Sequence, residues 1–185
     1  MTKAQLTVLA GPTAVGKGTV VAAITKRYPT LNVSVSATTR DPRPGELNGV
    51  HYYFVSAQEF DAMIERGDML EWALVHGKNK YGTPRGPVDE ALAAGKPVLL
   101  EIDLAGARQV RTTRPDAQFI FLAPPSWEEL ERRLIGRGTE SPEEQARRLA
   151  TARVELEAAS EFDHVVINDD VERAVDELAR LIGLE

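Results

Sequence analysis

The sequence contains no cysteine, which excludes both a disulfide framework and a metal site built from thiolates. Its three histidines are scattered along the chain without the spacing of metal ligands, and we assign them no catalytic role. Apolar runs are short, and none approaches the roughly 18 residues of a membrane-spanning helix. The first residues, MTKAQLTVLAG, also lack the long apolar stretch of a signal peptide. We therefore expect a cytoplasmic protein that does not interact with a membrane.

Positive charge is also scarce, because 22 lysines and arginines face 28 aspartates and glutamates, a net charge of −6. This balance disfavours a nucleic-acid polymer as partner, which would normally require a basic surface. A small anionic substrate held by a few clustered arginines remains compatible. The 185 residues suit one globular domain with appended subdomains. No pattern in them indicates an oligomeric state.

Five short apolar runs, each bounded by glycine, proline or polar residues, read as buried strands. They are Gln5–Ala10, Leu31–Val35, Val98–Ile102, Gln118–Leu122 and His164–Ile167. Helical patterns lie between them. This alternation predicts an α/β fold in which a parallel sheet carries helices on both faces.

Several helix ends are marked. Three serines followed by glutamate three residues later fit capping boxes, namely Ser56 with Glu59, Ser126 with Glu129 and Ser141 with Glu144. We therefore interpret these serines as caps and not as nucleophiles. Gly95 fits the C-cap of a helix over Val88–Ala94, and apolar residues from Val171 to Ile182 predict a final amphipathic helix.

The most informative segment is LTVLAGPTAVGKGTVVAAITKRY at residues 6–28, an apolar strand, a glycine-rich turn with a lysine, and a helix. Gly11, Gly16 and Lys17 fit the spacing G-x-x-x-x-G-K of a phosphate-binding loop. Backbone N–H groups at a helix N-terminus hold phosphate oxygens, and a lysine adds a mobile positive charge. Gly18 stands where the pattern usually has a magnesium-binding hydroxyl, and Thr19 follows it. The alternative is a glycine-rich turn that carries a surface lysine.

Two segments interrupt the strand and helix alternation. Residues 36–86 combine glycines with aromatic residues and the alternating run VHYYFVS, so we expect an inserted antiparallel lobe. Residues 127–157 are highly charged and helical, and the break GRG at 136–138 places Arg137 where a mobile element could carry it to a ligand. The alternative for this second segment is a solvated, charge-rich face. The core then comprises residues 1–35, 87–126 and 158–185.

Two further groups of residues suggest phosphate chemistry. Arg40 and Arg43 lie in a Pro-Gly-rich loop before Tyr52, and such arginines either bind a phosphate or are ordinary surface residues. The run VLLEIDLAG ends its apolar part at Asp103, which resembles the strand that carries a magnesium-directed carboxylate. Asp103 could instead cap the helix that starts at Leu104, and the two roles can coexist.

Taken together, the blocks resemble the guanylate kinase family over about residues 6–180. They are, in order, GPTAVGKGT, SATTRDPRPGELNG, the Y-x-F at Tyr52–Phe54, LEWA, YGTP, EIDLAG, APPS, RLIGRGTES and VINDD. The resemblance implies a P-loop nucleoside-monophosphate-kinase-like fold, with residues 36–86 as the GMP-binding lobe and 127–157 as the lid. It also implies transfer of the terminal phosphate of ATP to GMP with Mg²⁺.

The resemblance assigns site residues position by position. Its catalytic residues are Lys17, Arg43, Arg137 and Arg148. Its ATP-binding residues are Gly11, Pro12, Thr13, Ala14, Val15, Gly16, Lys17, Gly18, Thr19 and Asn168. Its GMP-binding residues are Ser36, Arg40, Arg43, Tyr52, Glu71, Tyr81, Thr83 and Asp103. Thr19 and Asp103 are the expected magnesium residues, directly or through water. Departures from the family pattern are Gly18 for a common serine, Ala14 for a common glycine and Ala37 for a common hydroxyl residue.

Glu71 also makes chemical sense as the residue that recognises guanine, although LEWALVHG by itself fits a surface glutamate on a strand. Guanine presents adjacent N1–H and N2–H donors that one carboxylate can accept, whereas adenine presents an acceptor. Two rival functions stay open at this point. One is a kinase for another nucleotide or a sugar phosphate, and the other is a catalytically inactive relative that binds phosphorylated partners.

Overall fold

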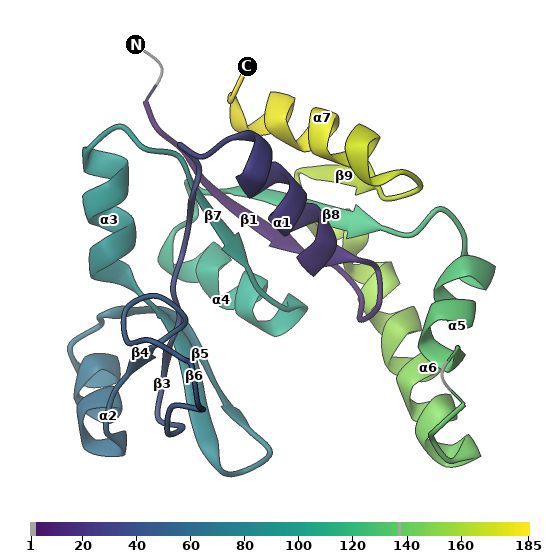
Figure 1. Cartoon of the computed structure of the whole chain (residues 1–185), viewed down its shortest axis with the longest axis horizontal. Coiled ribbons are helices and arrows are strands. Elements are labelled where there is room, and N and C mark those ends of the chain that lie inside the picture. The colour runs from purple at the N-terminus through teal and green to yellow at the C-terminus, as the bar shows by residue number, and fades with distance from the viewer. Residues whose placement is uncertain (1–2, 137) are drawn as a thin grey trace.

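The computed structural model describes residues 3–136 and 138–185, and its central feature is a five-stranded parallel sheet (Figure 1). The strand order is β2 (Asn32–Val33), β7 (Val98–Glu101), β1 (Leu6–Ala10), β8 (Gln118–Ala123) and β9 (His164–Ile167). Each neighbouring pair is parallel. The predicted α/β fold class is confirmed, and each predicted strand run contains a strand.

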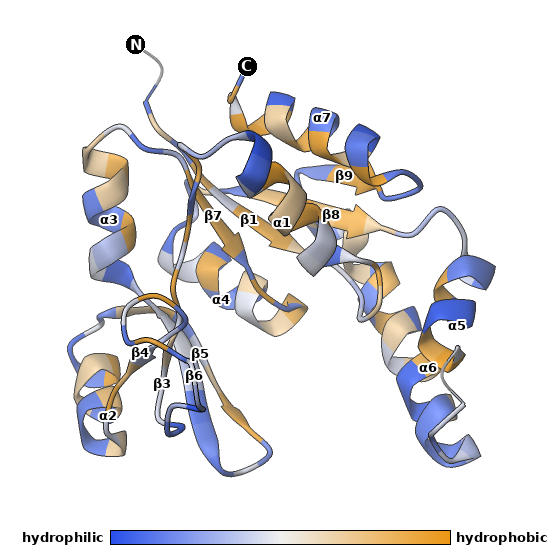
Figure 2. Cartoon of the chain, in the orientation of Figure 1, coloured by the Kyte–Doolittle hydropathy of each residue, from blue (hydrophilic) through white to orange (hydrophobic). Residues whose placement is uncertain are grey.

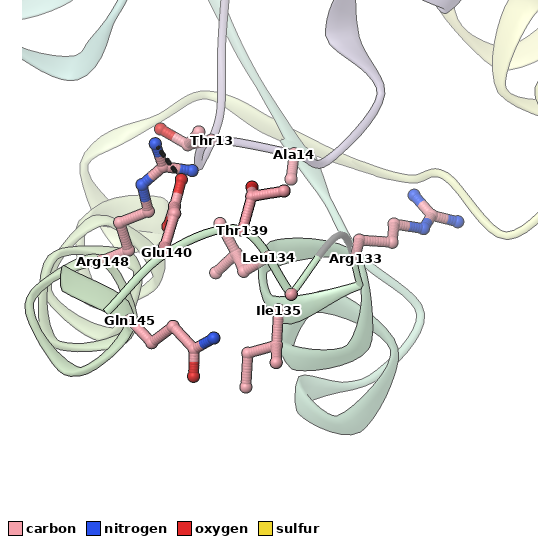
Figure 3. Close-up of a pocket in the computed structure, with 10 residues that line it drawn as sticks. Thr13, Ala14, Arg133, Leu134, Ile135, Thr139, Glu140, Gln145 and Arg148 are labelled. Carbon is pink, nitrogen blue, oxygen red and sulfur yellow. Dashed lines mark ion pairs between the residues drawn. The ribbon is translucent and has the colours of Figure 1, made fainter. Parts of the chain in front are cut away.

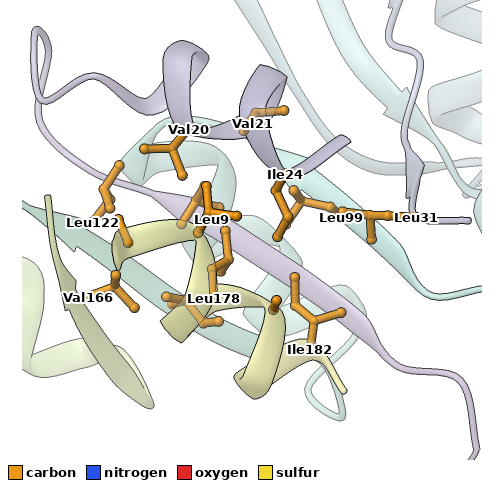
Figure 4. Packing of buried hydrophobic residues seen from close by; sticks show 14 of the residues in the cluster. Leu9, Val20, Val21, Ile24, Leu31, Leu99, Leu122, Val166, Leu178 and Ile182 are labelled. Carbon is orange, nitrogen blue, oxygen red and sulfur yellow. The ribbon is translucent and has the colours of Figure 1, made fainter. Parts of the chain in front are cut away.

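Helices α1 (Lys17–Arg27) and α7 (Val171–Ile182) cover one face of this sheet. Figure 4 shows Leu9 and Leu122 from the strands among Val20, Ile24 and Leu178 from the two helices. All five side chains are fully buried. The prediction of an amphipathic final helix is therefore confirmed, because the apolar stripe of α7 lies against the sheet.

Helices α3 (Arg85–Ala93) and α4 (Leu104–Thr113) cover the opposite face. Successive strand residues point to opposite sides of a sheet, so Leu6 and Val8 of β1 join this second cluster with Val88 of α3 and Val110 of α4. The inner strands β1, β7 and β8 therefore bury apolar residues on both sides, and their ribbons are largely orange, meaning hydrophobic, in Figure 2. The edge strands β2 and β9 differ from the prediction, because β2 is only two residues long and both strands are largely exposed.

A second sheet with the order β4 (Tyr53–Phe54), β3 (Ala37–Thr38), β6 (Asn79–Pro84) and β5 (Met69–Val75) forms the inserted lobe. Helix α2 (Ala57–Glu65) packs its buried Phe60 against this sheet. β6 is antiparallel to both β3 and β5, but β3 and β4 are parallel. The expectation of an antiparallel lobe is wrong for β4, because the chain crosses from β3 through a long loop before it pairs.

Between residues 127 and 157 the chain forms two helices as predicted, α5 (Trp127–Ile135) and α6 (Pro142–Glu157), followed by the short 3₁₀ helix η1 (Ala158–Glu161). Leu130, Leu134 and Ala152 make a small core between the two helices. Arg153 lies over the Trp127 ring at 4.0 Å. Most of the remaining charged residues of α6 are exposed, and much of the α6 ribbon is blue, meaning hydrophilic, in Figure 2.

Helix ends largely follow the sequence signals. Ser56, Ser126 and Ser141 each accept a hydrogen bond from the amide three residues on, and Ser141 with Glu144 forms the full reciprocal box. Helix α3 starts at Arg85, three residues before the predicted range. Its C-cap is Ala94, and Gly95 follows at φ +75°, the left-handed conformation that glycine adopts without steric cost. Within the described residues, every helix is too short or too polar to cross a bilayer.

Candidate active site

The predicted phosphate-binding loop lies at the carboxyl ends of the strands, between β1 and α1. A Cβ atom added to Gly11 would lie 2.5 Å from the Leu122 carbonyl oxygen, so strand β8 leaves no room for a side chain. A Cβ on Gly16 would lie 2.7 Å from Asn168 Nδ2, and Gly16 has φ +93°. Both motif glycines are therefore required by the fold itself.

Ala14 occupies a strained position in the same loop, with φ +69°. A non-glycine residue in this left-handed region costs about 1 kcal/mol or more. Alanine at this position, where the family commonly has glycine, therefore makes the conformation of the loop less favourable. The loop is braced at Val15, whose carbonyl oxygen accepts hydrogen bonds from Asn168 Nδ2 at 2.8 Å and Arg133 Nη1 at 3.2 Å.

Lys17 reaches from the start of α1 to the end of β7, where its Nζ donates to the Ile102 carbonyl oxygen at 3.0 Å. Burial lowers the pKa of Lys17, and the nearby carboxylates of Glu101, Asp103 and Glu155 act in the opposite direction. The lysine therefore lies among three acidic groups. Such a position suits a cation that must leave its present partner for an incoming phosphate.

Glu101 is a site residue that the sequence reasoning missed. A Cβ added to Gly18 would lie 3.8 Å from Glu101 Oε1, so this carboxylate faces the first turn of α1. Asp103 has a different contact, because its Oδ1 accepts from the Gly106 amide at 2.7 Å and caps α4. The run VLLE carried the signal, since its last residue is the acid that ends the otherwise buried strand β7.

The oxygen atoms around the predicted phosphate-binding loop fit a magnesium ion that is held mainly by phosphates. The exposed Thr19 hydroxyl, in the first turn of α1, and the Glu101 carboxylate are oxygen ligands, which Mg²⁺ prefers. In the part of the chain that the structure describes, no cluster of three acidic or histidine side chains could hold a metal alone. Mg²⁺ commonly binds through one or two carboxylates plus substrate phosphates, so these residues fit that mode.

Two carboxylates, those of Glu71 and Asp103, lie close together between the lobe and the core. Glu71 on β5 accepts a hydrogen bond at its Oε1 from Thr83 Oγ1 on β6 at 2.7 Å. A Cβ added to Gly106 would lie 3.1 Å from both Glu71 Oε2 and Asp103 Oδ1. Gly106, which the sequence reasoning also missed, therefore gives both carboxylates room at the N-terminus of α4.

Burial raises the pKa of the Glu71 carboxyl, the Thr83 hydrogen bond opposes that shift, and the negative Asp103 adds to it. Two carboxylates that face the same small space can together accept several N–H donors. The structure thus brings together three predicted residues, Glu71, Thr83 and Asp103. Ser36 lies one residue before β3 on the same lobe.

Arg40 is held by a partner that the sequence reasoning did not identify. Its two terminal nitrogens donate to the two oxygens of Glu46 at 2.9 and 3.0 Å. Arg40, together with the Arg43 amide, lowers the pKa of Glu46 to about 2. Its guanidinium also lies 5.3 Å from the Tyr52 ring centroid, and Tyr52 meets the predicted Tyr81 edge to face. The Arg43 residue itself is exposed.

The helical segment faces the phosphate loop across a cavity of about 420 Å³ (Figure 3). Thr13 and Ala14 of the loop line one side, and Arg133, Glu140 and Arg148 are among the residues on the other. Arg148 Nη2 pairs with Glu140 Oε1 at 2.5 Å, drawn as the dashed line in Figure 3. Arg137, the other predicted lid arginine, lies outside the described residues.

Two more groups face the loop from the outer elements. Glu155 on α6 has its pKa raised by burial, while the positive Lys17 acts to lower it. A larger cavity of about 940 Å³ is lined by Thr13, by α6 residues that include Arg147, and by His76 at the β5–β6 hairpin. Residues of the lobe, of the loop and of the helical segment therefore line this larger cavity together.

Comparison with known proteins places the chain in a family. The sequence model described as guanylate kinase matches residues 3–185. The chain is 61% identical over 178 residues to a guanylate kinase of Leifsonia xyli, covering 96% of this chain and 70% of that protein. It is 60% identical over 180 residues to one of Nocardia farcinica, covering 97% and 93%.

Solved structures give the same result. A guanylate kinase from Anaplasma phagocytophilum matches with a TM-score of 0.72 and 32% identity, over 98% of this chain and 85% of that one. A shikimate kinase from Bacteroides thetaiotaomicron, at 15% identity and a TM-score of 0.50 over 97% and 98% of the two chains, shares the fold alone. The extent of the match to the family model and to these relatives shows that the chain belongs to the guanylate kinase family.

Proposed function

We propose that this protein transfers the γ-phosphoryl group of ATP to GMP and forms ADP and GDP by direct in-line transfer. The observation that carries the proposal is the pair of carboxylates, Glu71 and Asp103, that both face Gly106. Guanine offers two adjacent donors, N1–H and N2–H, to such a pair. Adenine would bring an acceptor against a carboxylate, so its binding would leave buried polar atoms unpaired.

The GMP phosphate is assigned to Arg40, Arg43, Tyr52 and Tyr81. Glu46 fixes the plane of the Arg40 guanidinium through two hydrogen bonds. A fixed guanidinium loses less side-chain entropy when it binds a phosphate. Arg43, on the same exposed loop, is the residue that can move to the phosphate when GMP enters.

The ATP phosphates are assigned to the loop from Gly11 to Thr19, with Asn168 and Arg133 bracing it at Val15. Lys17 would exchange the Ile102 carbonyl for a phosphate oxygen and follow the group that is transferred. Arg148 and Arg137, on the lid, are assigned to neutralise the negative charge of the same phosphoryl group. Phosphoryl transfer needs alignment and charge neutralisation more than covalent chemistry, so no protein nucleophile is assigned.

Magnesium, bound with ATP, would supply further neutralisation of the phosphate charge. Thr19, Glu101 and Asp103 are the residues of this chain assigned to it. Glu101 faces Gly18 beside the loop, whereas Asp103 faces Glu71. We therefore assign Glu101 to the metal side and Asp103 chiefly to guanine, while Asp103 also caps α4.

A coupled assay of ADP formation tests this proposal with GMP, IMP, AMP and a hexose phosphate as acceptors. IMP keeps N1–H but lacks the 2-amino group, so its kcat/KM should fall between those of GMP and AMP. We expect GMP to exceed AMP by about a hundredfold or more. Equal use of AMP would support a kinase for other acceptors, and no turnover combined with phosphopeptide binding would support a binding module.

A further inference from the structure

The edge of strand β5 is held by side chains of α4 and not by another strand of its sheet. β5 is the last strand in the order β4, β3, β6, β5. The Trp72 amide donates to Gln109 Oε1 at 3.0 Å, and Gln109 Nε2 donates to the Trp72 carbonyl at 2.9 Å. The primary amide of Gln109 thus makes the two hydrogen bonds that a neighbouring strand residue would make.

A second contact lies two residues earlier on the same edge. Thr113 Oγ1 donates to the Leu70 carbonyl oxygen at 2.8 Å. The register between β5 and β6 shifts between Met69 and Glu71, so Leu70 lies in an irregularity of the strand pairing. The Leu70 side chain is fully buried in the core cluster of the main sheet. This point of the lobe is therefore anchored to the core through both backbone and side chain.

Glu71 lies between these two attachment points, since Leu70 precedes it and Trp72 follows it. Its own carboxylate faces Gly106, which is three residues before Gln109 on α4. Asp103 caps the same helix at its start. Helix α4 consequently carries one carboxylate at its N-terminus and fixes the backbone of the other through Gln109.

We propose that Gln109 is a positioning residue for guanine selectivity, because its amide fixes β5 so that the Glu71 carboxylate lies beside Asp103. The inference rests on the proposed GMP kinase activity. Gln109 itself touches the Trp72 backbone and acts on the base only through Glu71. A loss of its two hydrogen bonds lets β5 move relative to α4, and it lowers the discrimination between guanine and adenine.

The test uses Gln109→Met, which keeps an unbranched side chain and good helix propensity but cannot make the two backbone hydrogen bonds. Arg108→Met is the matched control on the adjacent residue of α4. Arg108 bonds to Glu161 at 2.9 and 2.7 Å, away from β5. Thr113→Val serves as a second, milder variant, because it removes the bond to the Leu70 carbonyl together with only two longer contacts to carbonyls of α4 itself, at 3.3 and 3.5 Å.

The measurement is kcat/KM for GMP and for AMP with saturating ATP. Two lost hydrogen bonds should lower the GMP-to-AMP ratio of Gln109→Met by about threefold to thirtyfold. KM for GMP should rise, while kcat for GMP should change by less than about threefold because no phosphate contact is removed. Thr113→Val should change the ratio in the same direction by a smaller factor, and Arg108→Met should leave it unchanged.

A double-mutant cycle separates positioning from a general folding role. In the Glu71→Gln background, Gln109→Met should change the GMP-to-AMP ratio by less than about twofold, because the group it positions is already altered. The inference would be overturned if Gln109→Met lowered kcat/KM equally for GMP and AMP. It would also be overturned if the effects of Gln109→Met and Glu71→Gln on the GMP-to-AMP ratio were additive. Hydrogen exchange at the Trp72 amide gives an activity-independent readout, and it should become faster in Gln109→Met.

Failure of the proposed function gives a different result. A parent enzyme that does not prefer GMP would contradict the proposed function before any variant is measured. A parent that prefers GMP, with an unchanged preference in folded Gln109→Met and Thr113→Val, would contradict only the role of Gln109. If Gln109→Met does not fold, the same ratio measured in Thr113→Val decides the question.

Discussion

Replacing Glu71 by glutamine should weaken guanine recognition and stabilise the unliganded protein. The wild-type carboxylate uses Oε1 for the Thr83 hydroxyl and presents Oε2 near Asp103. Glutamine can keep the Thr83 contact through its oxygen, but its NH₂ group then faces Asp103 and the guanine donors. The substitution therefore replaces the acceptor Oε2 with an N–H donor at the position that must accept a hydrogen bond from guanine.

A bidentate contact to a base is worth roughly 1–3 kcal/mol of discrimination. We therefore expect kcat/KM of Glu71→Gln for GMP to fall by about tenfold to a hundredfold, at 1.4 kcal/mol per decade. AMP should lose less or gain, because its ring acceptor can meet the new NH₂ group. The coupled ADP assay with both nucleotides measures this ratio, and Glu65→Gln at the exposed end of α2 is a control.

The stability effect has a defined pH dependence. Because burial raises the pKa of Glu71 in the folded protein, its stabilising contribution is complete below the unfolded value and is lost as pH rises through the raised pKa. Glu71→Gln removes the ionised, buried carboxylate, so it should raise Tm at pH 7 to 8. The difference in Tm between variant and parent should shrink as pH falls toward 5. An unchanged GMP-to-AMP ratio, or a lower Tm of the variant at pH 7.5, would refute this reasoning.

Three further predictions concern the phosphate side. Lys17→Met should lower kcat by about a hundredfold or more while Tm changes little, and Lys26→Met at the exposed end of α1 should leave kcat unchanged in the same assay. Arg148→Ala should lower kcat more than it weakens GMP binding measured by calorimetry, because Arg148 lines a cavity with Thr13 and Ala14 of the predicted phosphate-binding loop. Lost GMP affinity with normal kcat would contradict the assignment of Arg148 to ATP. Ala14→Gly should raise the free energy of unfolding by up to about 1 kcal/mol, since φ +69° suits glycine, and denaturant titration would contradict the strain if the variant were clearly less stable.

The sequence predicted the main sheet and the phosphate loop because their signals are local. Buried strands such as β1 read as short apolar runs, and the loop has a fixed spacing of glycines and lysine. The direction of β4 was not predictable from alternation in VHYYFVS, because alternation indicates burial and does not identify the partner strand. The exposure of β9 likewise depends on its place at the sheet edge.

Contacts between distant segments explain the site residues that were missed. Glu46 follows Arg40 by six residues in an irregular loop, where no periodicity predicts that they pair. Arg133 reaches the Val15 carbonyl across 118 residues, and Gln109 reaches Trp72 across 37. Asp103 caps α4, which confirms one of the two roles that its position suggested, and its proximity to Glu71 could not be read from the sequence. Such pairings become visible only when the fold brings the elements together.

A single-turnover experiment with [γ-³²P]ATP, Mg²⁺ and excess enzyme, quenched in the presence of GMP, tests the central claim most directly. Direct transfer between two nucleotides aligned by Lys17 and the Glu71–Asp103 pair predicts that the label passes from ATP to GDP at the rate of ATP loss, and none becomes attached to protein. With AMP in place of GMP, the label should stay on ATP over the same interval. Label on the protein, release as inorganic phosphate, or equal transfer to AMP would contradict the account.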